Sequence, residues 1–163
     1  MNNKSFTTSL LVDATPDKVF NAINNARGWW SEDIEGSTDK LNAEFNYHYK
    51  DIHIAKMKVT ELIQDKKVAW LVLENYFNFI KDQNEWKGTT IIFEISPKDK
   101  QTEIKFTHEG LVPEDECYNV CHDAWTSFIN KSLRDLITKG KGQPNPKDKE
   151  GEINKVVTEK WNI

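Results

Sequence analysis

The feature that most constrains the fold is a series of alternating apolar segments followed by one long segment with helical spacing. Between residues 44 and 108, apolar residues recur at every second position, which is typical of β-strands. The predicted strands cover residues 45–49, 52–63, 68–77, 89–95 and 102–108. Short polar turns at 64–67 and 97–100 connect neighbouring strands, which predicts an antiparallel meander.

After this meander the apolar residues follow the period of an α-helix. Pro113 and the three acidic residues after it are typical of a helix start, and Gly140 is typical of a helix end. The apolar stripe between them consists of Cys117, Cys121, Ala124, Trp125, Phe128 and Ser132, flanked by Ile129 and Leu136. We therefore expect an amphipathic helix over 113–139 that packs on the sheet, an α+β arrangement.

The two ends of the chain add shorter elements. Residues 5–13 predict a first strand, and Thr15 and Pro16 fit the N-cap and first position of a helix over 16–24. A turn or second short helix follows at 27–30, with a short strand near Ile34. The Gly- and Pro-containing segment 141–151 is typical of a linker, and 152–163 fits either a short docking helix or a disordered end.

Composition excludes several classes of protein. The chain has 163 residues, a formal net charge of −4 and only two cysteines. One domain is expected at this length, and the negative charge argues against nucleic-acid binding. No apolar run is long enough to span a membrane, and the first residues lack the apolar core of a signal peptide, so we expect a cytoplasmic location.

Local motifs resemble those of the START-like (SRPBCC) superfamily. The first is Thr15-Pro16 followed by Val19-Phe20, Ala22-Ile23 and Trp29-Trp30; the second is Phe106-Thr107-His108-Glu109-Gly110. Trp125, Phe128, Ile129 and Leu133 follow on the long helix, and Gly140, Gly142 and Pro144 come after it. Together they look like the branch related to the C-terminal domain of activators of heat-shock-protein-ninety ATPase.

The resemblance implies a helix-grip fold, in which a curved antiparallel sheet wraps around the long C-terminal helix with two short helices after the first strand. The expected domain covers residues 1–146, and 147–163 form a C-terminal tail outside it. Members of the superfamily bind lipids and other hydrophobic molecules in a cavity between sheet and helix. A few are cyclases or hydrolases and some act on a chaperone, but no common catalytic set can be carried over.

The candidate ligand-binding residues are those expected to face this cavity. They are His108, Tyr47, Phe45, Trp70, Glu74, Tyr76, Phe106, Tyr118, Trp125 and Phe128. His108 has the strand parity of Ile104 and Phe106, so it faces inward if they do, and it either contacts a ligand or bonds to the protein at the cavity rim.

The direction of Glu74 stays open. It shares strand parity with Trp70, Val72 and Tyr76, so it lies in an apolar cavity with a raised pKa if that face is the concave one. If Ala69, Leu71 and Leu73 face inward instead, Glu74 lies on the surface.

The remaining motifs favour structural roles. Cys117 and Cys121 are four residues apart, which is no zinc signature, and they are expected to be buried thiols. Phosphate-binding loops, paired carboxylates and nucleophile elbows do not occur, so no catalytic residue, metal or cofactor is expected.

We therefore expect a module that binds a small hydrophobic or amphipathic molecule. One alternative is an interaction protein that contacts a chaperone. The other is a cyclase- or hydrolase-type enzyme that uses His108 or Glu74. The apolar strand 68–77 also suggests self-association.

Overall fold

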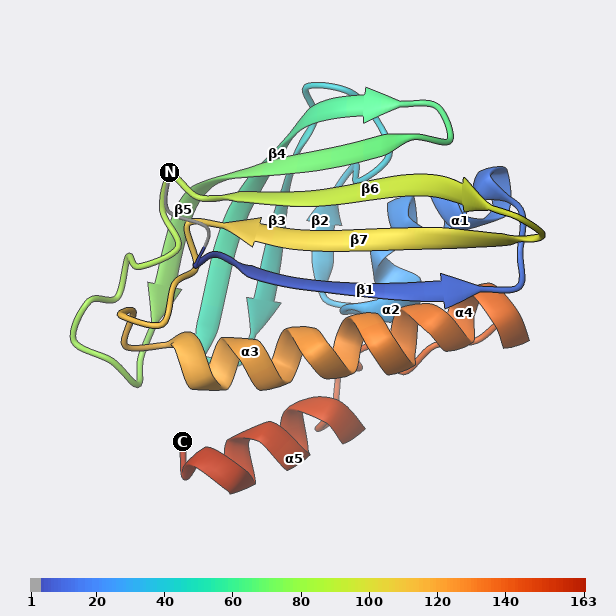
Figure 1. Ribbon diagram of the computed structural model, residues 1–163. Helices are drawn as coiled ribbons and strands as arrows, with labels where there is room; N and C mark the ends of the chain where they lie inside the picture. The colour runs from blue at the N-terminus through green and yellow to red at the C-terminus, as the bar shows by residue number, and fades with distance from the viewer. Residues whose placement is uncertain (1–3) are drawn as a thin grey trace.

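The alternating segments form a single curved sheet, and the helices pack on its concave side (Figure 1). The computed structural model describes residues 4–163. All seven strands are antiparallel, in the order β1-β7-β6-β5-β4-β3-β2, so the first strand joins the last one (Figure 1). The expected α+β helix-grip fold is confirmed, with the long helical segment lying across the sheet.

The elements follow the predicted order closely. They are β1 (Phe6–Val12), α1 (Pro16–Asn24), α2 (Ala26–Trp29), β2 (Ile34–Gly36), β3 (Glu44–Tyr49), β4 (His53–Ile63), β5 (Lys67–Phe77), β6 (Thr90–Lys98), β7 (Gln101–Glu109), α3 (Tyr118–Ser127), the π-helical turn η1 (Phe128–Leu133), α4 (Arg134–Lys139) and α5 (Glu152–Trp161).

Strand β5 changes face within its own length. Lys56 of β4 lies opposite Glu74, but the next residue, Met57, lies opposite Val72, so Leu73 is an extra residue in the ladder. Such a β-bulge reverses the side-chain alternation that follows it. Val72 before the bulge and Phe77 after it are therefore both buried on the concave side, although one has an even and the other an odd number.

The long helix begins later than its sequence suggests. Pro113 and the acidic residues after it form turns, and α3 starts at Tyr118. The cap comes from Glu85 in the loop between β5 and β6: its carboxylate accepts the backbone N–H groups of Glu116 at 2.6 Å and Cys117 at 2.9 Å. Because Glu85 lies 32 residues before Cys117, this cap leaves no local signal in the sequence.

The π-helical turn η1 lies in the middle of the predicted helix. A π-turn holds one residue more than an α-turn, and here Phe128, Ile129, Ser132 and Leu133 are all buried against the core. The helix then continues as α4 and ends at Gly140, whose φ of 81° lies in the left-handed region, as expected for a helix terminator.

The segment after Gly140 is fixed to the core rather than free. The Ser132 hydroxyl donates to the carbonyl oxygen of Trp29 at 2.6 Å and accepts the backbone N–H of Gln143 at 2.7 Å. The backbone N–H of Asn145 then donates to the Trp30 carbonyl oxygen at 2.9 Å. The expected linker therefore has two parts: 141–145 is held against α2, and 146–151 continues toward α5.

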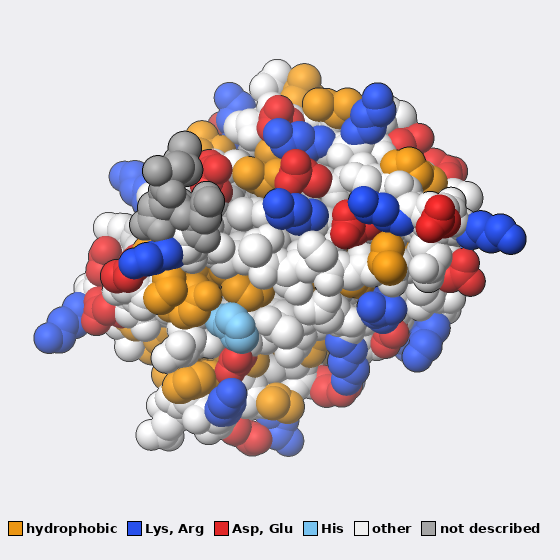
Figure 2. Space-filling model, in the orientation of Figure 1, with side chains coloured by type: hydrophobic (Ala, Val, Ile, Leu, Met, Phe, Trp, Pro, Cys, Tyr) orange, Lys and Arg blue, Asp and Glu red, His pale blue; other side chains and the backbone are white. Residues whose placement is uncertain are grey.

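The last segment is a docked helix, the first of the two alternatives that the sequence left open. Ile153 and Val157 of α5 are buried and Trp161 is half-buried, in agreement with their four-residue spacing. Figure 1 shows α5 (red) on the helical side of the molecule, next to α3. On the face shown in Figure 2, acidic and basic side chains are interspersed. None of the helices within residues 4–163 is long and apolar enough to cross a membrane.

Candidate functional site

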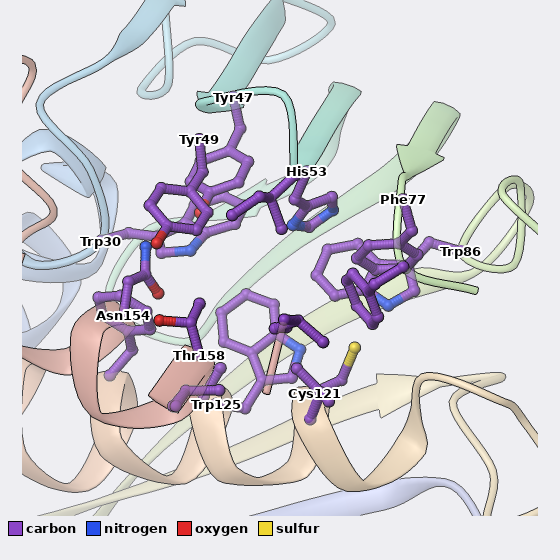
Figure 3. Close-up of a pocket in the computed structure, with 17 residues that line it drawn as sticks. Trp30, Tyr47, Tyr49, His53, Phe77, Trp86, Cys121, Trp125, Asn154 and Thr158 are labelled. Atoms are coloured by element: carbon purple, nitrogen blue, oxygen red, sulfur yellow. The ribbon is translucent and has the colours of Figure 1, made fainter. Parts of the chain in front are cut away.

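A small pocket lies where the ends of β3, β4 and β5 meet α3 and α5 (Figure 3). Its volume is about 60 Å³. The walls are mainly aromatic and come from Trp30, Tyr47, Tyr49, Phe77, Trp86 and Trp125. A cavity between the sheet and the long helix was expected from the fold, and this one is small compared with the roughly 300–1,000 Å³ of typical ligand pockets.

The aromatic walls hold one another in place. Trp30 stacks on Tyr47 with ring centroids 4.2 Å apart, and Trp86 stacks on Trp125 at 5.7 Å. The His53 ring lies on Phe77 at 4.2 Å and meets the edge of Trp86 at 4.5 Å. Large buried rings in mutual contact have little rotational freedom, so this part of the wall is rigid.

Among residues 4–163, His53 is the one imidazole that lines the pocket. Asn75 donates through Nδ2 to the Gln83 carbonyl oxygen, which leaves its Oδ1 to accept Nε2–H of His53 at 2.9 Å. Nδ1 of His53 is then an acceptor, and it has no hydrogen-bond partner within residues 4–163. Burial lowers the pKa of His53 to about 3, against a smaller opposite effect of Asn75, so the ring is neutral at neutral pH.

Two N–H donors at the pocket also lack partners. They are Nδ2 of Asn154 on α5 and Nε1 of Trp86, both buried and without a hydrogen bond among the described residues. Burial raises the pKa of Tyr47, with the neighbouring Asn154 amide acting in the opposite direction. None of the described lining residues has an Asp, Glu, Lys or Arg side chain, and the His53 ring is neutral, so the pocket offers a ligand little side-chain charge.

His108 lies behind the pocket wall, and both of its ring nitrogens are used. Nδ1 accepts the indole N–H of Trp125 at 3.1 Å, and Nε2 lies 2.8 Å from Oγ1 of Thr89. Burial, followed by the influence of His53, lowers the pKa of His108 to about 3. Of the two alternatives for His108, the geometry therefore matches bonding to the protein.

The other sequence candidates fall into three groups. Tyr47, Trp125 and Phe128 line the pocket. Phe45, Trp70 and Phe106 are fully buried in the core, away from it. Tyr118 is half-buried on α3 beside His122, also outside the pocket.

Of the two directions left open for Glu74, the structure has the outward one, and the expected placement of Tyr76 at the cavity is wrong; the bulge at Leu73 is the reason for both. Both side chains are exposed on the convex side of the sheet, where they border a separate shallow depression. A carboxylate at this position meets water instead of an apolar cavity.

Several lining residues lay outside the set of sequence candidates. Phe77 shares the face of Trp70 only because of the bulge, and Trp86 lies in a connection that reads as polar loop. Asn154 and Val157 come from the C-terminal segment. Tyr49 had a usable signal, since it has the strand parity of Phe45 and Tyr47. Cys121 and Ala124 also had one, since they lie on the apolar stripe of the long helix with Trp125.

The two cysteines are free and buried. A hydrogen bond with Cys121, together with burial, raises the pKa of the Cys117 thiol. Cys121 lines the pocket. Within residues 4–163, His, Cys, Asp and Glu side chains form no group of three or more with the arrangement of a metal site.

Comparison with solved structures supports the fold over most of the chain. The Aha1 dimer from Colwellia psychrerythraea shares 26% sequence identity, with a TM-score of 0.69 over 85% of this chain and 98% of the other. Protein MLL2253 from Mesorhizobium loti has 14% identity and a TM-score of 0.64, covering 81% and 96% of the two chains. CalU16 from Micromonospora echinospora has 14% identity and a TM-score of 0.60, covering 95% and 82%.

The comparison with curated proteins gave no match. A family profile, in contrast, matches residues 13–138, from the end of β1 to α4. This stretch contains strands β2 to β7 of the curved sheet and the long helix, but neither β1 nor α5. On this match the chain belongs to the family described as Activator of Hsp90 ATPase homolog 1-like protein.

Proposed function

We propose that the protein binds a small, uncharged, apolar or amphipathic molecule in the pocket between the sheet, α3 and α5. The observation that carries this proposal is a cavity with aromatic walls and unpartnered hydrogen-bonding groups but no charged side chain. Binding of hydrophobic ligands is also common among proteins with this fold, as the sequence resemblance implies.

Elementary energetics favour such a ligand. Burial of apolar surface contributes about 25 cal/mol per Å², and aromatic walls offer it on several sides. An acceptor atom on the ligand gives Trp86 the partner that it lacks, which is worth about 1–3 kcal/mol for a buried group. A charged ligand loses its hydration and meets no oppositely charged side chain among the lining residues, so charge is selected against.

Matched pairs of probes test this proposal. 2-Naphthol and 2-naphthoate have the same ring system and differ in charge at neutral pH. We expect 2-naphthol to raise the melting temperature and quench tryptophan fluorescence, and 2-naphthoate to do neither at the same concentration. Equal binding of both probes, or no binding of any uncharged aromatic or aliphatic probe, contradicts the proposal.

A control variant identifies the site. Trp125→Leu removes one wall of the pocket and should abolish the response to 2-naphthol. Tyr76→Ala lies on the convex side and should leave the response unchanged. Loss of binding in both variants, or in neither, places the probe elsewhere.

A second proposal concerns partners. The Colwellia relative is described as a dimer, and the family is described as resembling activators of the Hsp90 ATPase. These descriptions support testing this chain for self-association and for binding to an Hsp90-type chaperone. Light scattering at increasing protein concentration tests the first, and pull-down with measurement of ATPase stimulation tests the second. A monomer at every concentration and an unchanged ATPase rate contradict them.

A further inference from the structure

We propose that α5 is a displaceable lid on the pocket, so that the protein binds its ligand with α5 undocked. This inference rests on the proposed function, since it concerns how the same pocket is opened.

The helix supplies one side of the pocket wall and narrows the pocket. Asn154, Val157 and Thr158 of α5, and Ile163 after it, all line the space (Figure 3). With α5 docked, the remaining volume of about 60 Å³ holds only a few non-hydrogen atoms, whereas ligand pockets typically measure about 300–1,000 Å³. The rest of the wall consists largely of packed rings on the sheet and α3, so α5 is the element whose movement enlarges the pocket.

The apolar contact that holds α5 is small. Ile153 and Val157 are its only buried hydrophobic residues, and Trp161 is half-buried. Val156, on the other side of the helix, is 61% exposed. A ten-residue helix with two buried apolar side chains depends on few contacts for its position, so its undocking costs much less than global unfolding.

The docked position leaves a polar group poorly satisfied. The Asn154 side chain is only 7% exposed, and its amide faces the Tyr47 hydroxyl, but Nδ2 makes no hydrogen bond of normal geometry among the described residues. When α5 moves away, water solvates this amide. Docking therefore carries a cost that an apolar residue at the same position would not impose.

The charged partners on α5, Glu152 and Lys160, are more than half exposed, so water competes for them, whereas Asp123 of α3 is partly buried. Asp123 of α3 accepts Nζ of Lys160 at 2.8 Å and Nε1 of Trp161 at 2.9 Å. Lys131 pairs with Glu152 at 2.6 Å, and both of these side chains are more than half exposed. Ion pairs at a solvated surface contribute little and weaken with added salt, so they position the helix without locking it.

The chain on either side of the lid fits this movement. Asn145 is bonded to α2 through its backbone, whereas Lys147, Asp148 and Lys149 are exposed and lie outside regular secondary structure. Residues 147–149 therefore form an exposed connection between a fixed point and α5, and Gly151, just before α5, is buried against Asn145 and Pro146. Glu150 contacts Tyr49 and Lys50 at the rim.

The test uses N-phenyl-1-naphthylamine, an uncharged fluorescent probe larger than the closed pocket. In the double variant Lys131→Glu/Lys160→Glu, both rim pairs become like-charge pairs, while no pocket-lining residue changes. Because docking of α5 competes with the probe, we expect the variant to bind it about tenfold more tightly than the wild type. The control Lys18→Glu/Lys66→Glu makes the same charge change at two exposed residues that have no ion pair within residues 4–163, and it should bind like the wild type.

Hydrogen exchange on the unchanged protein gives the reciprocal measurement. By thermodynamic linkage, if undocking of α5 increases the affinity for the probe, the bound probe increases the undocked population by the same factor. Saturating the protein with the probe should therefore increase amide exchange in residues 154–160 and not in β6 or β7. Equal affinity in wild type and Lys131→Glu/Lys160→Glu, or unchanged exchange in α5 at saturation, overturns the lid while leaving the proposed function intact. If neither protein binds any uncharged probe, the proposed function fails, and the lid fails with it.

Discussion

Trp125 and His108 are joined by a hydrogen bond of 3.1 Å from the indole N–H to Nδ1 of the imidazole. Since Nδ1 is the acceptor, the proton of the neutral ring lies on Nε2 and faces Oγ1 of Thr89, 2.8 Å away. Thr89 in turn donates to the carbonyl oxygen of Trp86 at 2.6 Å. This chain of bonds connects α3, β7 and the loop before β6. It fixes the positions of Trp125 and Trp86, two of the aromatic residues in the pocket wall, relative to each other.

The first prediction concerns pH. His53 and His108 have a pKa of about 3 in the folded protein and about 6.5 when unfolded, so only the unfolded state gains their protons between these values. The two rings contribute stability that is present above pH 6.5 and is lost as the pH falls. Each contributes a slope of about 1.4 kcal/mol per pH unit in this window.

Urea titrations at about pH 6 and about pH 5, above the range of most carboxylates, measure this slope. His108→Gln removes one of the two rings and should reduce the slope by about half, in addition to lowering stability at neutral pH. A slope that is the same in wild type and His108→Gln contradicts the assignment of a neutral, buried His108.

The second prediction tests the bulge at Leu73. Phe77→Ala removes a fully buried ring and should destabilise the protein by about 3–5 kcal/mol. Tyr76→Ala changes an exposed ring on the convex side of the sheet and should change stability by less than about 0.5 kcal/mol. Similar losses at both positions, measured by chemical unfolding, would mean that β5 keeps simple alternation.

The third prediction concerns the attachment of residues 141–145. A Cβ at Gly142 would lie 2.7 Å from the carbonyl oxygens of Gly28 and Ser132, with backbone on both sides. Gly142→Ala should therefore destabilise the protein by about 1–3 kcal/mol through steric strain. A Cβ at Gly140 would meet no atom within 4 Å, so Gly140→Ala should cost only the strain of its left-handed φ, about 1 kcal/mol. A larger loss of stability in Gly140→Ala than in Gly142→Ala would contradict the close packing around Gly142.

The fourth prediction concerns Asn154. Asn154→Leu replaces a buried amide without a partner by an apolar side chain next to an aromatic pocket, so thermal unfolding should show a gain of about 1 kcal/mol. Asn119→Leu, on the exposed side of α3, is the control and should give no gain. If Asn154→Leu destabilises the protein, the Asn154 amide has a favourable partner when α5 is docked.

Most of the fold could be predicted from local patterns. The two periods of hydrophobicity located the strands and the long helix, and Pro16 and Gly140 correctly marked a helix start and a helix end. These signals are local because each depends on residues within a turn or two. The long helix also showed the limit of such signals, since its start is set by Glu85 and its middle contains a π-turn.

The pocket was harder to predict, because its walls depend on contacts that are distant in sequence. A one-residue bulge moved Glu74 and Tyr76 to the outer surface and brought Phe77 inward. Trp86 is buried only because its loop folds back over His108, at a ring distance of 4.7 Å. Strand parity alone was sufficient for Tyr47, where the pairing with β4 has no irregularity.

The central claim is that an uncharged ligand enters the aromatic pocket. Nuclear magnetic resonance of the indole N–H groups during a titration with 2-naphthol tests it most directly, with the six signals assigned by single Trp→Phe variants. The signals of Trp86 and Trp125 should shift and saturate together with the change in melting temperature. A titration that shifts only Trp161, or none of the indole signals, would contradict binding in this pocket.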